Sequence, residues 1–183
     1  VAIGDALGGT TEFMSEREIK NKYGQLTDII GGGVWQLSPG EVTDDTAMTL
    51  CVAQGIIQSP DDPIPHMGEE FLSWYAQKPK DVGIIISQVL TTYKDNWEEA
   101  AKEVHHRLSG KSAGNGSLMR CLPIPLAYSD QKKMEELTIR HSKMTHYDDL
   151  ASDACLIYNR IASRLLNGDE LAVSLREETA GTL

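Results

Sequence analysis

The fold of this chain is decided by one stretch of sequence, Thr43-Asp44-Asp45-Thr46-Ala47-Met48-Thr49-Leu50-Cys51-Val52. A hydroxyl residue and two acidic residues precede an apolar run, which is the pattern of a capped helix N-terminus. The apolar side chains continue through Ile56 and Ile57 and stop near Ser59-Pro60. We therefore expect a largely buried helix that begins at Thr43 and carries a cluster of oxygen atoms at its mouth.

Helical periodicity also dominates the rest of the chain, and runs of alternating polar and β-branched residues are nearly absent. We expect a small, glycine-rich, buried helix within residues 1–13 and a short helix over 16–22, which follows the capping-box pattern Ser15-Glu16-Arg17-Glu18. Further helices are predicted at 66–78, 81–94, 97–108, 130–144, 148–167 and 169–178. The helix at 148–167 is expected to face inward through Leu150, Ala154, Leu156, Ile157, Ile161 and Leu165. The predicted fold class is all-α, a compact multi-helix fold.

Loops rich in glycine and proline separate these helices. Residues 24–42 contain Gly24, Gly31-Gly32-Gly33, Pro39 and Gly40, which are too many helix breakers for a helix. A long loop in a compact domain is often functional. Residues 59–65 form a turn-rich connector, and residues 109–116 form a second loop of small residues. We interpret the whole of residues 1–183 as a single domain.

Composition excludes some classes of function. The formal net charge is −10, and the basic residues are scattered, so nucleic acid is a poor partner. No apolar run approaches the length of a membrane span, and the first twenty residues lack the pattern of a signal peptide, so we expect a cytoplasmic protein without a membrane partner. Cys51, Cys121 and Cys155 each lie in an apolar stretch, which favours buried, reduced thiols.

The acidic residues offer two interpretations. Thr43, Asp44 and Asp45 supply the oxygen ligands that Mg²⁺ or Mn²⁺ prefers, if the backbone turns into a helix there. The same residues could simply cap a helix and complement its dipole, and Asp61-Asp62 and Asp148-Asp149 are also adjacent pairs beside predicted helices. Glu12 either belongs to a solvated face or reaches a site.

The segment from Lys111 to Arg120 is a second candidate. Its small residues expose backbone N–H groups that could hold an anion, although the Asn115-Gly116 pair could equally make a tight turn. A phosphate-binding P-loop is rejected because His105 stands where that motif needs glycine. We expect His105 and His106 on the surface, whereas His146 could contact a ligand or cap a helix.

Several motifs occur in order along essentially the whole chain: Gly4-Asp5-Ala6-Leu7-Gly8, Glu12, Gly31 to Gly33, Pro39-Gly40-x-x-Thr43-Asp44-Asp45-Thr46, Gly114-Asn115-Gly116-Ser117-x-Met119-Arg120 and Thr145-His146. Together they resemble the ADP-ribosylglycohydrolase family, which includes the dinitrogenase-reductase-activating glycohydrolases. The resemblance implies an all-α fold, a two-metal site for Mg²⁺ or Mn²⁺, and hydrolysis of the bond between ADP-ribose and a protein side chain or a related acceptor. The implied substrate is an ADP-ribosylated protein or a small ADP-ribose conjugate.

The resemblance also implies roles for particular residues. Thr43, Asp44 and Asp45 would bind metal, with Asp44 or Asp45 as the carboxylate that activates water. Glu12 would be the mobile glutamate that covers the site. The ADP-ribose cleft would be lined by Ser112, Gly114, Asn115, Gly116 and His146, whereas Met119 and Arg120 would anchor the loop.

One motif of the family is not found in this sequence. Family members carry a second acidic motif close to Gly-Gly-Asp-Thr-Asp-Thr, and nothing after residue 146 matches it. We therefore expect the N-terminal two-thirds of the family's fold, an incomplete metal site, and exposed apolar surface that favours self-association. The alternatives are a truncated or degenerate, non-catalytic module that binds ADP-ribose or a protein, and a metal-dependent phosphate hydrolase.

Overall fold

The structure is a computed structural model that describes residues 1–180. Within those residues it is all-α, as predicted, and contains no β-strand. The predicted single domain spans residues 1–183, so its last three residues lie outside the described part. The helices are α1 (Ala2–Gly8), α2 (Glu16–Tyr23), α3 (Asp44–Gln58), α4 (Ile64–Ala76), α5 (Ile84–Thr92), α6 (Trp97–Arg107), the 3-10 helix η1 (Leu118–Arg120), α7 (Pro123–Ala127), α8 (Gln131–Lys143), α9 (Asp149–Leu166) and α10 (Leu171–Thr179).

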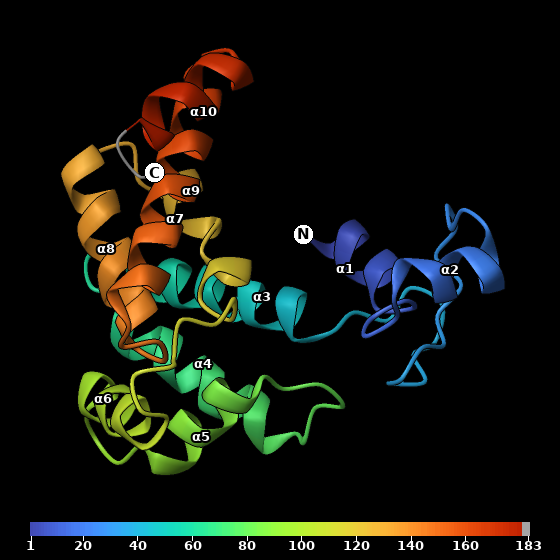
Figure 1. Ribbon diagram of the computed structural model, residues 1–183. Helices are drawn as coiled ribbons and strands as arrows, with labels where there is room; N and C mark the ends of the chain where they lie inside the picture. The colour runs from blue at the N-terminus through green and yellow to red at the C-terminus, as the bar shows by residue number, and fades with distance from the viewer. Residues whose placement is uncertain (181–183) are drawn as a thin grey trace.

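Helix α3 is the centre of the molecule, as the opening stretch predicts. It runs through the middle of Figure 1, with α4 and α5 on one side and α7 to α9 on the other. Met48 and Val52 are fully buried in a core that also contains Phe71 of α4 and Leu137 of α8. Gly55 lets α4 approach closely, because a Cβ at that position would lie 2.6 Å from the backbone nitrogen of Met67.

Residues 1–42 form an N-terminal arm that stands beside the main body in Figure 1. The arm holds α1, α2 and the predicted long loop, in which Gly31, Gly32 and Gly33 all adopt positive φ. A helix forms within residues 1–13, as predicted, but the prediction that it is buried was wrong. Helix α1 ends at Gly8 and only Ala6 is buried in it, because the helix lies in the arm, where Ile3 remains 78% exposed.

Helix α9 is correctly located, but its inward face was wrongly assigned. Leu150 is 66% exposed and Leu165 is 41% exposed. The buried face consists of Ala151, Ser152, Cys155 and Asn159. These small and polar residues let α9 pack against polar partners, since the Asn159 amide donates to the Thr138 hydroxyl of α8 at 2.8 Å.

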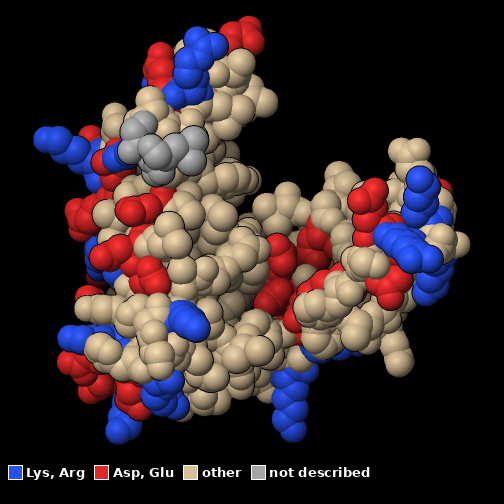
Figure 2. Space-filling view, in the orientation of Figure 1, with Lys and Arg blue, Asp and Glu red and all other residues tan. Residues whose placement is uncertain are grey.

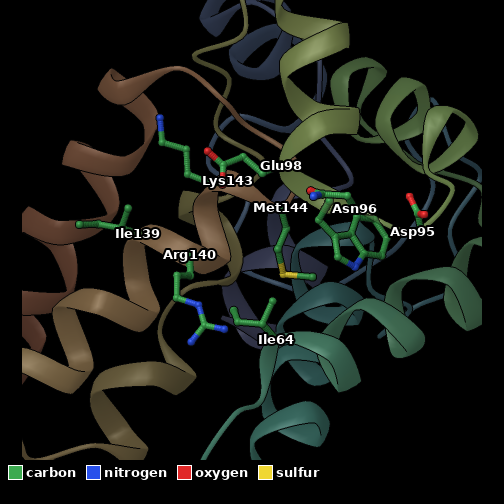
Figure 3. A pocket seen from close by; sticks show the side chains of 9 residues that line it. Ile64, Asp95, Asn96, Glu98, Ile139, Arg140, Lys143 and Met144 are labelled. Carbon is green, nitrogen blue, oxygen red and sulfur yellow. The ribbon is translucent and has the colours of Figure 1, made fainter.

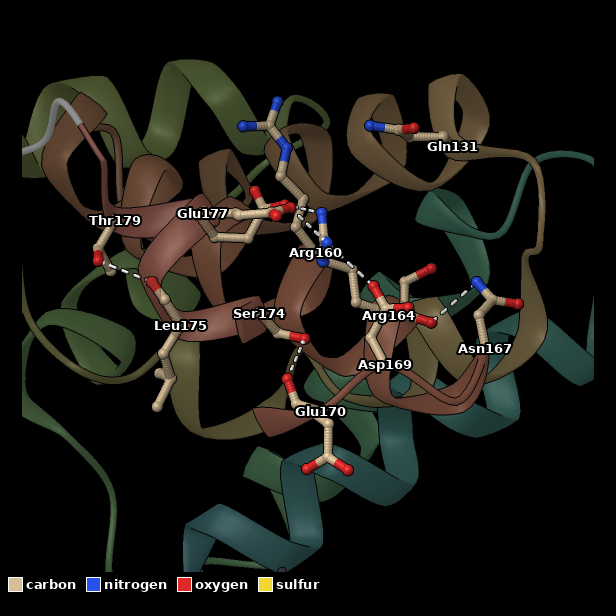
Figure 4. Close-up of polar contacts among 12 residues, drawn as sticks. Gln131, Arg160, Arg164, Asn167, Asp169, Glu170, Ser174, Leu175, Glu177 and Thr179 are labelled. Atoms are coloured by element: carbon tan, nitrogen blue, oxygen red, sulfur yellow. Dashed lines mark hydrogen bonds and ion pairs between the residues drawn. The ribbon is translucent and has the colours of Figure 1, made fainter. Parts of the chain in front are cut away.

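Charged side chains fix the turn between α9 and α10. Arg164 of α9 forms ion pairs with Asp169 in the turn and with Glu177 and Glu178 of α10. Figure 4 shows this group and the Ser174 hydroxyl, which donates to the Glu170 carbonyl. The turn is therefore held by electrostatic contacts while several apolar side chains of α10 remain exposed.

The sequence interpretation missed the short helices η1 and α7. Helix α7 has the sequence Pro123-Ile124-Pro125-Leu126-Ala127, in which two prolines suggest a break. Proline is nevertheless tolerated in the first turn of a helix, where its missing N–H has no partner in any case. Both short helices matter for the site, because they connect the loop at 109–116 to the core.

Two further predictions concern features distributed over the chain. The three cysteines are free and buried, as expected. No helix within residues 1–180 is long and apolar enough to cross a membrane.

The close approach of α3 and α4 yields a prediction for stability. We expect Gly55→Ala to lower the free energy of unfolding by about 1–3 kcal/mol, because the added methyl group meets the Met67 backbone. Gly4→Ala is the matched control: it lies inside α1, no atom lies within 4 Å of the added Cβ, and helix propensity favours alanine. Urea unfolding of both variants measures the difference. Equal stability of the two variants would contradict the close α3–α4 contact.

Candidate functional site

The N-terminus of α3 is capped by a residue distant in sequence. Thr43 has no side-chain capping bond of its own. Instead the Asp5 carboxylate of α1 accepts from the backbone N–H and the hydroxyl of both Thr43 and Thr46, with distances of 2.8 Å from Thr43 Oγ1 and 3.0 Å from Thr46 N. The Thr43 hydroxyl proton therefore points to Asp5, and the lone pairs of Oγ1 stay available to a cation.

Acidic side chains crowd around this helix start. The charge of Glu12 from the arm acts on Asp45 of α3 and on Asp81, which precedes α5. Figure 2 shows acidic side chains in the hollow between the arm and the main body. Asp44 is only 7% exposed, and its Oδ2 accepts from the Gly83 N–H at 3.2 Å. The start of α3 therefore forms the floor of an acidic cleft.

The crowding shifts the acid-base behaviour of three carboxyl groups. Burial, followed by the charges of Asp44 and Asp5, raises the pKa of Asp45 to about 6. Burial and the charge of Asp44 raise the pKa of Asp81 to about 7. The pKa of Asp44 is also raised, mainly by burial. Like charges held this close favour either a shared proton or a bound cation.

Asp81 is the site residue that sequence reasoning missed. It shares a hydrogen bond with Asp44 and lines a small pocket of 160 Å³ together with Thr43, Asp44 and Lys80. It sits in the short connection Pro79-Lys80-Asp81 without a recognisable motif. Only the folding of α4 back against α3 brings this connection to the site, so its local sequence carried no signal.

Glu12 lies in the turns after α1 and not in a helix, because α1 ends at Gly8 and does not extend through the predicted range 1–13. The indole Nε1–H of Trp35 donates to Glu12 Oε2 at 2.6 Å. Phe13 meets the same indole edge-on at 6.2 Å between ring centroids. The long loop of the arm therefore fixes the Glu12 carboxylate through a residue that sequence reasoning did not single out.

The second predicted loop lies beside His146. An added Cβ on Gly114 would lie 3.3 Å from His146 Nε2, and one on Gly116 would lie 2.9 Å from His146 Cε1. Only residues without a side chain allow the backbone to come this close to the ring. Asn115 is exposed between the two glycines. The loop and the histidine predicted to line one cleft are thus brought together.

Ser112 and Arg120 anchor the two ends of this loop. Ser112 is 1% exposed, and its hydroxyl lies 2.7 Å from His105 Nδ1, so it faces the protein. Its predicted contact with a ligand stays a prediction. His105 is partly buried where it makes this contact, so the expectation that it lies on the surface was wrong. His106 is exposed, as expected. Arg120 is completely buried, as its predicted anchoring role requires.

The residues around the start of α3 carry the types of oxygen ligand that a hard cation prefers. They offer one hydroxyl and several carboxylates, and their mutual repulsion favours a positive charge between them. Within residues 1–180, however, no group of three or more His, Cys, Asp or Glu side chains is arranged to hold a metal ion by itself. The donors therefore fit one side of a metal site.

A larger pocket of 390 Å³ lies between α4, α6 and α8, away from the acidic cleft (Figure 3). Its basic residues already have partners, since Lys143 pairs with Asp149 and Arg140 pairs with Asp62. This pocket therefore offers no unpaired basic side chain to an anionic ligand among its lining residues, and the acidic cleft remains the candidate site.

Comparisons with known proteins agree on one family. The family model for ADP-ribosylglycohydrolase matches residues 1–182. ADP-ribosyl-[dinitrogen reductase] glycohydrolase of Rhodospirillum rubrum is 34% identical over 169 residues, covering 92% of this chain and 56% of the relative. ADP-ribosylarginine hydrolase Tri1 of Pseudomonas putida is 29% identical, covering 98% of this chain and 47% of the relative. The chain thus spans about half the length of these curated relatives.

A solved structure supports the same grouping. A chain described as an ADP-ribosylglycohydrolase-related protein complex superimposes with a TM-score of 0.75 at 28% identity. The match covers 98% of this chain and 57% of that chain. The arrangement of helices described above is therefore shared with that structure.

The raised pKa of Asp81 predicts a pH-dependent effect on stability. A carboxyl group with a raised folded-state pKa favours folding at low pH, and this contribution is lost as pH rises through about 7. In metal-free protein we expect Asp81→Asn to raise the melting temperature at pH 8. At pH 5 the rise should be much smaller, because folded-state Asp81 is still protonated and only the unfolded chain, with the ordinary pKa of 3.8, has ionised. Thermal unfolding in EDTA at both pH values tests this, and an equal shift at both would refute the crowding of carboxylates.

Proposed function

The chain belongs to the ADP-ribosylglycohydrolase family, and we propose that it acts in metal-dependent hydrolysis of the glycosidic bond between ADP-ribose and a protein side chain or related acceptor. The observation that carries this proposal is that two clusters of predicted site residues lie beside the same helix, α5. The acidic cluster at the start of α3 and the loop at Gly114–Gly116 with His146 come from distant parts of the sequence, yet both adjoin α5, at Gly83 and at Ile85 and Ile86.

The kind of substrate is inferred from the relatives. One is named for ADP-ribosyl-dinitrogen reductase, and another for ADP-ribosylarginine. We propose that an ADP-ribosylated protein or a small ADP-ribose conjugate is the substrate here. The location in the cytoplasm and the expected self-association stay predictions.

We propose that Thr43, Asp44 and Asp45 hold Mg²⁺ or Mn²⁺ from one side. When bound, such a cation polarises ribose oxygens and makes water a stronger nucleophile. The orientation of the Thr43 hydroxyl towards Asp5 supports this role, because it leaves the oxygen lone pairs free. Asp81 stabilises the set by its hydrogen bond to Asp44.

Asp45 is the better candidate for accepting a proton from water. Asp44 is buried and its carboxylate accepts hydrogen bonds from Gly83 and Asp81, whereas Asp45 is only partly buried and, within the described residues, its carboxylate bonds to no other residue. Glycoside hydrolysis needs a carboxylate near the attacked carbon, because the transition state resembles an oxocarbenium ion. Glu12 acts on the same acidic cluster and is proposed to cover the ribose from the position in which Trp35 holds it.

The first test replaces both aspartates. We expect Asp44→Asn with Asp45→Asn to abolish metal-dependent release of ADP-ribose, because amides keep the shape but lose the charge. The control is Asp61→Asn with Asp62→Asn, another adjacent pair, whose members form only exposed ion pairs with Lys133 and Arg140. Chromatography of the products with and without Mn²⁺ measures the result.

The products also discriminate between reaction types. Free ADP-ribose indicates cleavage of the glycosidic bond, whereas AMP indicates cleavage of the pyrophosphate. Full activity of the Asp44/Asp45 variant would sink the assignment of these residues. Wild-type protein that binds ADP-ribose without releasing it from a conjugate would support a binding module in place of a hydrolase.

The contact between Trp35 and Glu12 gives a second test. Trp35→Phe retains an aromatic ring beside Phe13 but removes the N–H that holds Glu12. We expect a lower kcat in this variant, because the carboxylate loses its fixed position. In a double-mutant cycle with Glu12→Gln, the two effects should not add, since both variants disturb one contact. Additive effects would show that Trp35 acts independently of Glu12.

A further inference from the structure

Arg120 is a buried cation without a carboxylate partner in the described residues. Its side chain is completely enclosed, and its guanidinium stacks 4.4 Å from the centroid of the Phe71 ring. Burial lowers its pKa to about 10, so it stays charged at neutral pH. A buried charge is costly unless its donors are satisfied. The groups that accept from Arg120 are therefore held firmly.

Two of these acceptors lie at the end of α8 and just after it. Arg120 Nε donates to His141 Nε2 at 3.0 Å, and Arg120 Nη2 donates to Thr145 Oγ1 at 2.8 Å. The same Thr145 oxygen lies 2.8 Å from Nδ1 of His146. A continuous chain of contacts thus runs from Arg120 through Thr145 to His146.

The direction of the last bond follows from counting protons. Thr145 has one hydroxyl proton, and one of its lone pairs already accepts from Arg120. Within residues 1–180, the only side-chain acceptor beside that hydroxyl is His146 Nδ1. If Nδ1 instead carried the proton, the buried Thr145 hydroxyl would donate to nothing. The arrangement therefore favours a His146 ring with its proton on Nε2.

His146 Nε2 faces the loop at Gly114–Gly116. It is the ring nitrogen 3.3 Å from the position of a Cβ on Gly114. It has no hydrogen-bond partner in the described residues, yet it is not fully enclosed, in contrast to His141 Nδ1. A polar atom of a side chain that is 1% exposed is thus left unpaired at the loop.

We propose that Arg120 is a positioning residue: through Thr145 it holds His146 in the Nε2–H tautomer, so that the ring donates a hydrogen bond to a ligand oxygen at the Gly114–Gly116 loop. The ligand part of this proposal rests on the proposed function, which places ADP-ribose in that loop. Within residues 1–180, Arg120 has no hydrogen bond to the loop glycines or to the acidic cluster, so its effect on the His146 tautomer passes through Thr145.

The tautomer is measured directly by NMR of protein labelled with ¹⁵N-histidine. We expect wild-type His146 to show the Nε2–H pattern without any ligand present. Arg120→Met removes the charged donor that polarises the Thr145 hydroxyl and makes it a stronger donor to Nδ1, so the preference should weaken and both tautomers should be populated. Thr145→Val removes the hydroxyl that accepts from Arg120 and donates to His146, so it should also allow both tautomers. Thr145→Ser keeps this hydroxyl and should retain the wild-type pattern.

Binding of ADP-ribose, measured by calorimetry, gives the second readout. We expect Thr145→Val to weaken binding about five- to tenfold, the loss of roughly one hydrogen bond, and Thr145→Ser to restore it. The matched control is Thr138→Val. It removes another buried hydroxyl, which is bonded to Met134 and Asn159 and lies outside the relay, that is, the chain of contacts Arg120–Thr145–His146. This control should leave both the tautomer and the affinity unchanged.

The outcomes separate this proposal from the proposed function. A wild-type His146 with its proton on Nδ1 overturns the relay without any variant, so a misfolded variant cannot hide the answer. Unchanged tautomer and affinity in both Arg120→Met and Thr145→Val also overturn it. The Nε2–H tautomer in a wild-type protein that has no affinity for ADP-ribose would support the relay and reject the proposed ligand.

Discussion

The carboxylate of Asp5 is the interaction on which the site depends. The first N–H groups of a helix have no partner within it, and at α3 those of Thr43 and Thr46 are satisfied from α1. One carboxylate thereby ties the N-terminal arm to the central helix and fixes where Asp44 and Asp45 project. It also occupies the hydroxyl protons of both threonines. The helix cap and the proposed metal ligands therefore belong to one structure. The two interpretations of Thr43-Asp44-Asp45, as a helix cap and as a metal site, are compatible.

Charge is distributed unevenly across the site. Burial and the charges of neighbouring carboxylates raise the pKa values of Asp44 and Asp45 at the start of α3, and the charge of the buried Arg120 opposes this shift at Asp44. Burial, followed by the charge of the same arginine, lowers the pKa of His146 to about 3. The buried cation thus makes one carboxylate more readily ionised and helps burial to keep one imidazole neutral. A neutral imidazole has one donor and one acceptor, so its tautomer decides what it offers to a ligand.

The sequence predicted the elements that local patterns encode. Helix α3, the capping box before α2 and the glycine loop of the arm were located from residue types alone. The inward face of α9 was not, because periodicity locates an apolar stripe but not the small, polar stripe that packs on α8. Asp81 and Trp35 were missed for a different reason. Each lies in a connection without a motif, and only tertiary packing brings it to an acidic residue.

The two predicted clusters differ in what they can hold, and this difference orients a ligand. The acidic end offers oxygen atoms and repels an anion unless a cation intervenes. The loop end is predicted to offer backbone N–H groups and, in the proposed tautomer, would also offer the His146 N–H, which suits oxygens with negative charge. A molecule with hydroxyl groups at one end and phosphate oxygens beside them would lie with its hydroxyls towards Thr43, Asp44 and Asp45. The reverse orientation would place phosphate against carboxylates. Under the proposed function, this polarity would direct the ribose end of ADP-ribose, and with it the glycosidic bond, towards Asp45.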